Sequence, residues 1–195
     1  MKLVILGRDG ILNHYREDHV KSPDEWEPIE GALEAVARLH HAGYHVVVAT
    51  NQSGIGRGMI DMASVNAVHV HMVQRAQAMG GRIDAVFFCP HTPEDRCACR
   101  KPLPGMMQDI GDRYGVDLST VPMVSDTLRD MEAASAAGCP AHLILSGRAA
   151  QLDPSQREQL LQRVPAVNIH TSLSAFVDEW VGELPAHEDG RRPAA

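Results

Sequence analysis

Short apolar runs alternate with segments of helical period along most of this chain. The apolar runs predict β-strands at residues 3–6, 45–49, 85–88, 122–124, 142–145 and 167–169. Apolar residues that recur every three or four positions predict helices at residues 31–41, 63–79, 104–114, 128–137, 155–163 and 173–181. Glycines follow the first two predicted helices, and Pro104 opens the third at a position where a first turn tolerates proline.

Strand–helix alternation of this kind predicts a three-layer, Rossmann-like α/β fold with a mostly parallel sheet. Ligands of such sheets bind outside the carboxyl ends of the strands. We expect one domain over residues 1–182 and a disordered tail over residues 183–195, which carry no apolar period. The polar connection at residues 13–28 is long enough to fold over the site as a minimal cap.

The overall charge narrows the choice of ligands. The formal net charge is -7 over 195 residues, which argues against nucleic acid or an anionic membrane as a partner. A phosphorylated substrate would therefore need locally focused positive charge or a metal. With no apolar run of roughly 20 residues and no signal-peptide pattern, we expect a cytoplasmic protein, and we expect it to be a monomer.

Polar residues gather where four of the predicted strands end. The segments are Gly7-Arg8-Asp9-Gly10, Thr50-Asn51-Gln52-Ser53-Gly54, Arg100-Lys101-Pro102 and Ser125-Asp126-Thr127. Taken alone, Asp9-Gly10 reads equally well as a turn and Asp126 as a helix N-cap. Four such loops in this order favour a binding site over those separate explanations.

Other polar residues are expected to be structural. Asp130 is expected to be a surface or helix-first-turn carboxylate and not a ligand. His69 and His71 lie two positions apart on a helix, point to different faces and are expected to be solvated. Cys139 is expected to be a small core residue.

Three of the four cysteines crowd together with a histidine. Without a secretion signal this spacing indicates metal binding, not disulfides. Three thiolates and one imidazole form the ligand set of a closed, tetrahedral zinc site; the alternative is four scattered buried residues. The predicted ligands are Cys89, His91, Cys97 and Cys99. A structural Zn²⁺ there would fix the loop that presents Arg100 and Lys101.

With these motifs the chain resembles the haloacid-dehalogenase-like superfamily and, within it, the D-glycero-D-manno-heptose 1,7-bisphosphate phosphatase family. The resemblance covers about residues 1–147. It implies a haloacid-dehalogenase-like fold and Mg²⁺-dependent removal of the C7 phosphate from a small phosphorylated sugar, in the synthesis of lipopolysaccharide precursors. Two positions depart from the family pattern. Gly7 stands where the family has aspartate, and Ser125 stands where glycine is usual.

The resemblance also implies residue roles. Asp9 matches the general acid/base, and its backbone carbonyl faces Mg²⁺, which Asp126 also binds. The residues implied for phosphate and sugar binding are Thr50, Asn51, Lys101, Arg100 and a flexible segment, Ser53 to Gly58, that includes Arg57.

Gly7 removes the family's nucleophile. Loss of a nucleophile in another covalent enzyme costs on the order of 10⁶ in turnover, or about 8 kcal/mol of barrier. We therefore weigh two hypotheses: a strongly impaired phosphatase, and an inactive pseudophosphatase that binds a sugar phosphate or a partner. We expect Gly7→Asp alone to fit the backbone path and restore activity. If it does not, crowding by Ser125, which stands where glycine is usual, is the first explanation to test.

Overall fold

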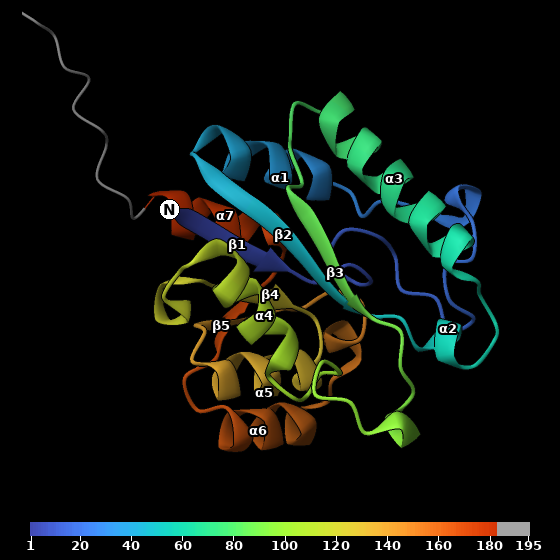
Figure 1. Ribbon diagram of the computed structural model, residues 1–195. Helices are drawn as coiled ribbons and strands as arrows, with labels where there is room; N and C mark the ends of the chain where they lie inside the picture. Colours follow the sequence, from blue (N-terminus) through green and yellow to red (C-terminus); the bar gives the residue numbers. More distant parts are fainter. Residues whose placement is uncertain (183–195) are drawn as a thin grey trace, which may run out of the picture.

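The computed structural model describes residues 1–182, which form an α/β structure around one parallel sheet (Figure 1). The expected tail at 183–195 lies outside the described residues. The strands are β1 (Lys2–Leu6), β2 (Tyr44–Asn51), β3 (Ala85–Cys89), β4 (Met123–Ser125), β5 (Ala141–Ile144) and β6 (Asn168–His170). Their order in the sheet is β3-β2-β1-β4-β5-β6, and every pairing is parallel. This confirms the predicted fold class.

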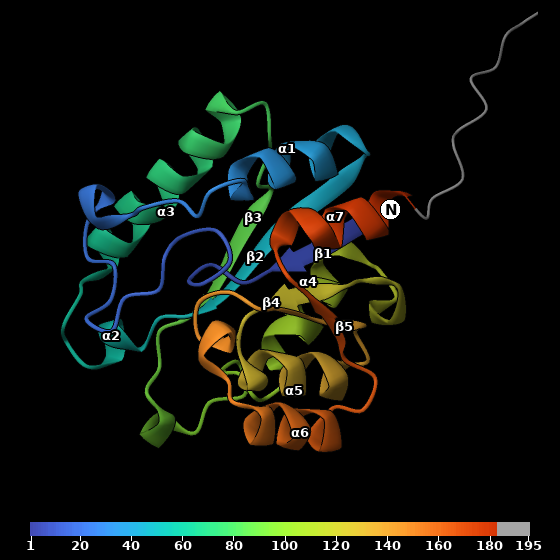
Figure 2. The same cartoon turned by 180° about the vertical axis from the view of Figure 1, so that it is seen from behind.

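Helices cover both faces of the sheet, as the two opposite views show (Figures 1 and 2). They are α1 (Ala32–His41), α2 (Ser53–Gly56), α3 (Met62–Ala78), α4 (Gly105–Tyr114), α5 (Leu128–Ala137), α6 (Pro154–Arg163) and α7 (Leu173–Gly182). Short 3-10 turns are η1 (Pro23–Glu25), η2 (Pro93–Asp95), η3 (Leu118–Thr120) and η4 (Ala149–Gln151). No helix within residues 1–182 is long and apolar enough to cross a membrane.

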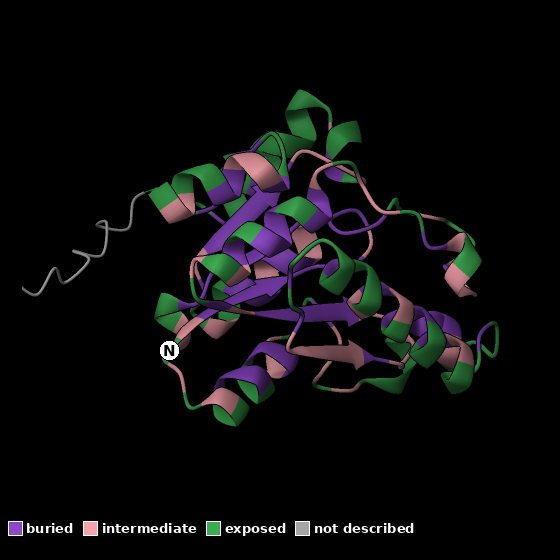
Figure 3. Ribbon diagram, turned by 90° about the horizontal axis from the view of Figure 1, so that it is seen from above, coloured by how far each residue is buried: buried purple, intermediate pink, exposed green. Residues whose placement is uncertain are grey.

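The sheet separates two hydrophobic cores because strand side chains alternate between its faces. In β1, Val4 and Leu6 pack with α1, α3 and α7 on one face. Leu3 and Ile5 pack with α4, α5 and α6 on the other. The central strands are therefore buried on both sides, as their continuous apolar sequence predicted, and the outer faces of the helices carry the exposed residues (Figure 3).

Ser53 to Gly58 was expected to be a flexible segment, and within it Ser53–Gly56 forms the short helix α2. One local expectation is wrong. His69 was expected to be solvated, but it is buried on α3, and its Nε2 lies 3.2 Å from Nη1 of Arg8. Burial and the Arg8 charge lower the pKa of His69 to about 4, so it is neutral at physiological pH.

Candidate active site

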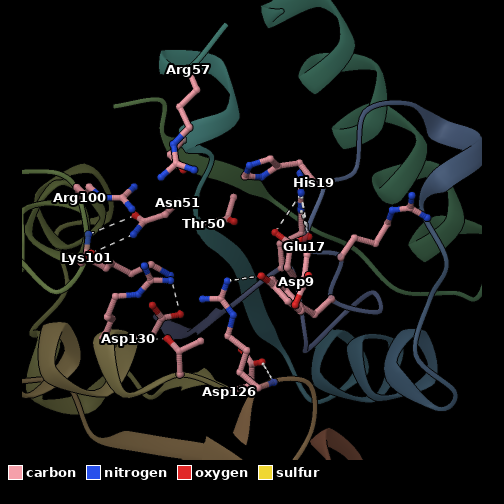
Figure 4. A pocket seen from close by; sticks show the side chains of 17 residues that line it. Asp9, Glu17, His19, Thr50, Asn51, Arg57, Arg100, Lys101, Asp126 and Asp130 are labelled. Carbon is pink, nitrogen blue, oxygen red and sulfur yellow. Dashed lines mark hydrogen bonds and ion pairs between the residues drawn. The ribbon is translucent and has the colours of Figure 1, made fainter. Parts of the chain in front are cut away.

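The carboxyl ends of the strands open onto one pocket of about 200 Å³ (Figure 4). Since parallel strands all end at the same edge, loops far apart in the sequence meet there. The predicted site residues that line it are Asp9, Thr50, Asn51, Ser53, Arg57, Arg100, Lys101 and Asp126. Residues of the 13–28 connection, Tyr15 to Glu17 and His19, line the opposite wall, so this segment does lie over the site.

Asp9 is held as an anion by three neighbouring side chains. Arg8, which is fully buried, donates to it at 2.9 Å and 3.1 Å, and Asn13 and Gln52 each donate at 3.0 Å. Burial acts to raise the pKa of Asp9, but the Arg8 charge and these hydrogen bonds outweigh it and hold the pKa below its usual value. Asp9 is therefore a fixed, ionised acceptor and not a simple turn residue.

Asp126 is a buried carboxylate directly after β4. It is not the N-cap of α5, because Thr127 holds that position. Its Oδ2 accepts a hydrogen bond from the backbone N–H of Arg148 at 2.8 Å. Burial raises the pKa of Asp126 to about 7, and the negative charge of Asp130 adds to the rise. A cation beside it would favour the ionised form, so the group suits a metal ligand.

Lys101 forms a buried ion pair that the sequence did not reveal. Its Nζ donates to Oδ2 of Asp130 at 2.8 Å and to the carbonyl of Ala49 at 2.8 Å. Asp130 was expected to be a surface or helix-first-turn carboxylate; it does lie in the first turn of α5, but it is not at the surface, being 6% exposed. The first turn of α5 faces the pocket and not solvent, which the helical period alone could not indicate. The positive charge of Lys101 is therefore already paired with Asp130 before any ligand binds in the pocket.

Asn51 and Thr50 lie at the end of β2, and their side chains are held by different partners. The side-chain amide of Asn51 donates to the carbonyl of Lys101 at 3.0 Å and accepts from its N–H at 3.2 Å. Asn51 therefore positions Lys101. Thr50 accepts a hydrogen bond from Gln52 at 2.9 Å, which leaves its own hydroxyl proton available to a ligand.

Gly7 follows β1, and Ser125 closes the space beside it. The backbone at Gly7 is not in the left-handed region, so the conformation would accept an aspartate, as expected. The space around Gly7, however, is too small for a side chain unless Ser125 moves. A Cβ at this position would lie 2.6 Å from Oγ of Ser125. This overturns our expectation that Gly7→Asp alone fits without strain.

Positive charge is concentrated in the pocket although the chain is acidic. Seven arginine and lysine side chains line it against four carboxylates. Within residues 1–182, the guanidinium groups of Arg57 and Arg129 make no side-chain hydrogen bond or ion pair. Arg148 stacks over the Tyr15 ring at 4.2 Å and donates to its hydroxyl at 2.6 Å, which links two walls of the pocket. Sequence reasoning missed Arg129 and Arg148 because neither lies in a recognisable motif.

The cysteine loop after β3 has the geometry of a zinc site. Sγ of Cys97 lies 3.6 Å from Cys89 and 3.5 Å from Cys99, and Nδ1 of His91 lies 3.4 Å from Cys99. Ligands around Zn²⁺ at 2.3 Å would stand about 3.8 Å apart at the corners of a tetrahedron. All four ligand atoms lie within 4.8 Å of one another, and none of the three cysteines in the cluster forms a disulfide. The cluster therefore could bind zinc. Arg100 donates to the carbonyl of His91, which ties this loop to the pocket.

Comparisons with known proteins agree with this geometry. A family model described as HAD-hydrolase-like matches residues 98–171, and one described as polynucleotide kinase 3 phosphatase matches residues 9–126. These matches and the fold define the class: a HAD-like phosphatase.

Sequence relatives define the family more narrowly. The chain is 55% identical over 147 residues to D-glycero-beta-D-manno-heptose-1,7-bisphosphate 7-phosphatase of Bordetella bronchiseptica, covering 75% of this chain and 82% of the relative. The identity to the protein of the same name from Pseudomonas aeruginosa is 47%, with 75% and 82% covered. The chain belongs to the family of D-glycero-beta-D-manno-heptose-1,7-bisphosphate 7-phosphatases.

Solved structures agree. The D,D-heptose 1,7-bisphosphate phosphatase from B. bronchiseptica, complexed with magnesium and phosphate, superposes with a TM-score of 0.87 at 47% identity, covering 94% of this chain and all of that one. The phosphatase from Burkholderia thailandensis gives 0.70 at 42% identity, again covering 94% and 100%.

Removal of one zinc ligand tests the cysteine cluster. We expect purified protein to carry about one Zn²⁺ per chain and Cys97→Ser to lose most of it, because a closed site needs all four ligands. Elemental analysis measures the content. Cys139→Ser, which lies outside the cluster, is the matched control and should keep its zinc. Equal zinc in Cys97→Ser and the parent would contradict the assignment.

The Lys101–Asp130 pair makes a stability prediction. Asp130→Asn leaves a buried ammonium without its counter-charge, and we expect a loss of about 3–5 kcal/mol in the free energy of unfolding. Urea denaturation measures it. Asp178→Asn, which breaks the exposed pair with Arg38, should leave the midpoint almost unchanged. A similar loss of unfolding free energy in both variants would contradict the prediction that the buried pair contributes more to stability than the exposed one.

Proposed function

We propose that this chain binds a phosphorylated sugar in the pocket and hydrolyses its phosphate ester only very slowly, with residues 1–182 acting as one domain. The observation that carries the proposal is the glycine at position 7. It stands at the carboxyl end of β1 within a site that, apart from Ser125, otherwise resembles the family's motifs, and its side chain offers no atom that could attack phosphorus. The names of the relatives support a heptose 1,7-bisphosphate as the ligand.

Charge and hydrogen-bond donors support binding of a phosphate ester. Lys101, Arg57 and Arg129 line the pocket, and the guanidinium groups of the last two have no side-chain partner among residues 1–182. Arginine forks suit phosphate oxygens, and the Thr50 hydroxyl can add a neutral donor. The missing carboxylate at position 7 also removes one source of repulsion for the anion. The pocket therefore favours a dianionic ligand without needing the nucleophile.

The residues present fit Mg²⁺, although with a reduced ligand set. The carboxylate of Asp126 and the backbone carbonyl of Asp9 would hold the ion, since Mg²⁺ prefers oxygen ligands. When bound, the ion would neutralise charge on the transferring phosphoryl group. Glycine at position 7 supplies no side-chain oxygen, so we expect weaker Mg²⁺ binding than in a relative that has aspartate there.

Asp9 limits what the remaining site can catalyse. Because its pKa is held below the usual value, it starts as an anion and must first gain a proton to act as a general acid. It can accept a proton from a water molecule without that step. Slow attack by water with Asp9 as the base is therefore the route we expect for any residual turnover.

The second candidate function is that of the relatives, a Mg²⁺-dependent phosphatase that removes the C7 phosphate. It is favoured by the other family residues that line the pocket, including Asp9, Lys101 and Asp126. Hydrolysis at an ordinary rate by the unmutated chain would select it over the binder.

Ligand binding should stabilise the protein. A heptose 1,7-bisphosphate at 100 times its Kd adds about 2.7 kcal/mol to the folded state. At this size that is a rise of about 5–10 °C in Tm. We expect Arg57→Gln and Arg129→Gln each to reduce the rise by at least half. These variants test ligand binding more directly than Lys101→Ala, which would also leave the buried carboxylate of Asp130 without its counter-charge.

The matched control for these variants is Arg157→Gln, an exposed arginine of α6 that does not line the pocket. It should keep the full rise in Tm, as measured by differential scanning fluorimetry. Absence of any shift in the unmutated protein at millimolar ligand would remove the support for a binder.

Restoring the nucleophile should restore chemistry when the space is restored with it. We expect Gly7→Asp combined with Ser125→Gly to release phosphate from heptose 1,7-bisphosphate with Mg²⁺ at least about 10³-fold faster than the parent. Adding Asp126→Ala should remove most of this gain because the ion loses its carboxylate. A folded, zinc-loaded double variant that stays inactive would indicate that the site has lost more than position 7.

A further inference from the structure

The side chain of Ser125 packs directly against Gly7. The two residues lie at the ends of neighbouring strands, and the N–H of Gly7 donates to the carbonyl of Val124 at 2.8 Å. A Cβ added to Gly7 would meet Oγ of Ser125 at 2.6 Å and its Cβ at 3.3 Å, and Cγ1 of Ile11 closes the other side at 3.3 Å. A separation below 3.0 Å is one that real Cβ atoms essentially never show. The hydroxyl therefore occupies the space into which any side chain at position 7 would grow.

This hydroxyl is not free to turn away. Ser125 is 1% exposed, and its Oγ donates to Oδ2 of Asp130 at 2.5 Å. The same carboxylate oxygen accepts from Nζ of Lys101 at 2.8 Å. Rotation of the serine would break a buried hydrogen bond to a charged acceptor, which is among the stronger hydrogen bonds in proteins. The contact with Gly7 and the Lys101–Asp130 pair are thus parts of one packed unit.

Backbone conformation does not account for the glycine at position 7. Its φ lies outside the left-handed region. Gly10, three residues on, is different: it has a φ of 82°, and a Cβ there would fall 2.1 Å from the carboxylate of Asp126. Gly10 is needed both for its conformation and for space. At Gly7 only space is at stake, and Ser125 supplies the closest contact.

We propose that Gly7 and Ser125 are a matched pair, in which Ser125 is a positioning residue that fills the space of the missing side chain and anchors the Asp130–Lys101 pair. Glycine at position 7 is then a built feature of this pocket and not an isolated substitution in an otherwise unaltered site. The inference concerns the same pocket as the proposed function, but it depends on packing and not on the identity of the ligand.

A thermal cycle over four chains tests the pair without any ligand: the parent, Gly7→Ala, Ser125→Gly and the double variant. Alanine adds only the Cβ. In the parent background, we expect Gly7→Ala to lower Tm by about 3 °C or more, because the Ser125 hydrogen bond is lost or strained. In the Ser125→Gly background, the same change should leave Tm unchanged or raise it, since alanine restricts the unfolded chain more than glycine does.

Gly182→Ala is the matched control, because a Cβ there meets no atom of the part of the chain that the structure describes within 4 Å. It should shift Tm equally in the two backgrounds. If Gly7→Ala proves insoluble, recovery of a folded protein by adding Ser125→Gly counts as the expected result, and failure to recover overturns the proposal. An equal fall from Gly7→Ala in both backgrounds, or no fall in the parent, also overturns it. Because no phosphate is present, this outcome is independent of whether the pocket binds a sugar phosphate.

Discussion

Parallel pairing of β1 between β2 and β4 is the constraint on which the pocket depends. Register places Leu6 beside both Val48 and Val124, so the residues that follow these strands emerge at the same edge of the sheet. Asp9, Thr50 and Asp126 lie at or just after the ends of these strands, so they share one pocket although they are far apart in the sequence. The same closeness of β1 and β4 brings Ser125 against Gly7, so the effect of a substitution at position 7 depends on the residue at position 125.

The buried pair of Lys101 and Asp130 connects the pocket to the rest of the protein. Lys101 follows the cysteine loop, and Asn51 holds its backbone at the end of β2. Asp130 belongs to α5 and carries the hydrogen bond from Ser125. The ammonium group of Lys101 is thus held by contacts with a strand, a helix and a loop that a Zn²⁺ would stabilise. These contacts hold the pocket together although position 7 carries no side chain.

The sequence predicted the sheet and most helices well, because central strands buried on both faces read as continuous apolar runs and the helices show a clear period. It also predicted the zinc cluster and eight of the pocket residues, since these lie in short local motifs. It failed where tertiary contacts decide. Asp130 and His69 look like surface residues on their helices, and only the packed structure shows Lys101 and Arg8 against them. The fit of Ser125 against Gly7 likewise depends on two strands distant in sequence, so only the suspicion of crowding could be raised beforehand.

The central claim is that this chain keeps the ligand pocket of its family but has lost covalent catalysis. Steady-state phosphate release by the unmutated protein, at saturating heptose 1,7-bisphosphate and Mg²⁺, tests it most directly when the relative from B. bronchiseptica is assayed beside it. Our account predicts a kcat at least about 10³-fold below that of the relative. A kcat within tenfold of the relative would contradict it and would require a nucleophile other than residue 7.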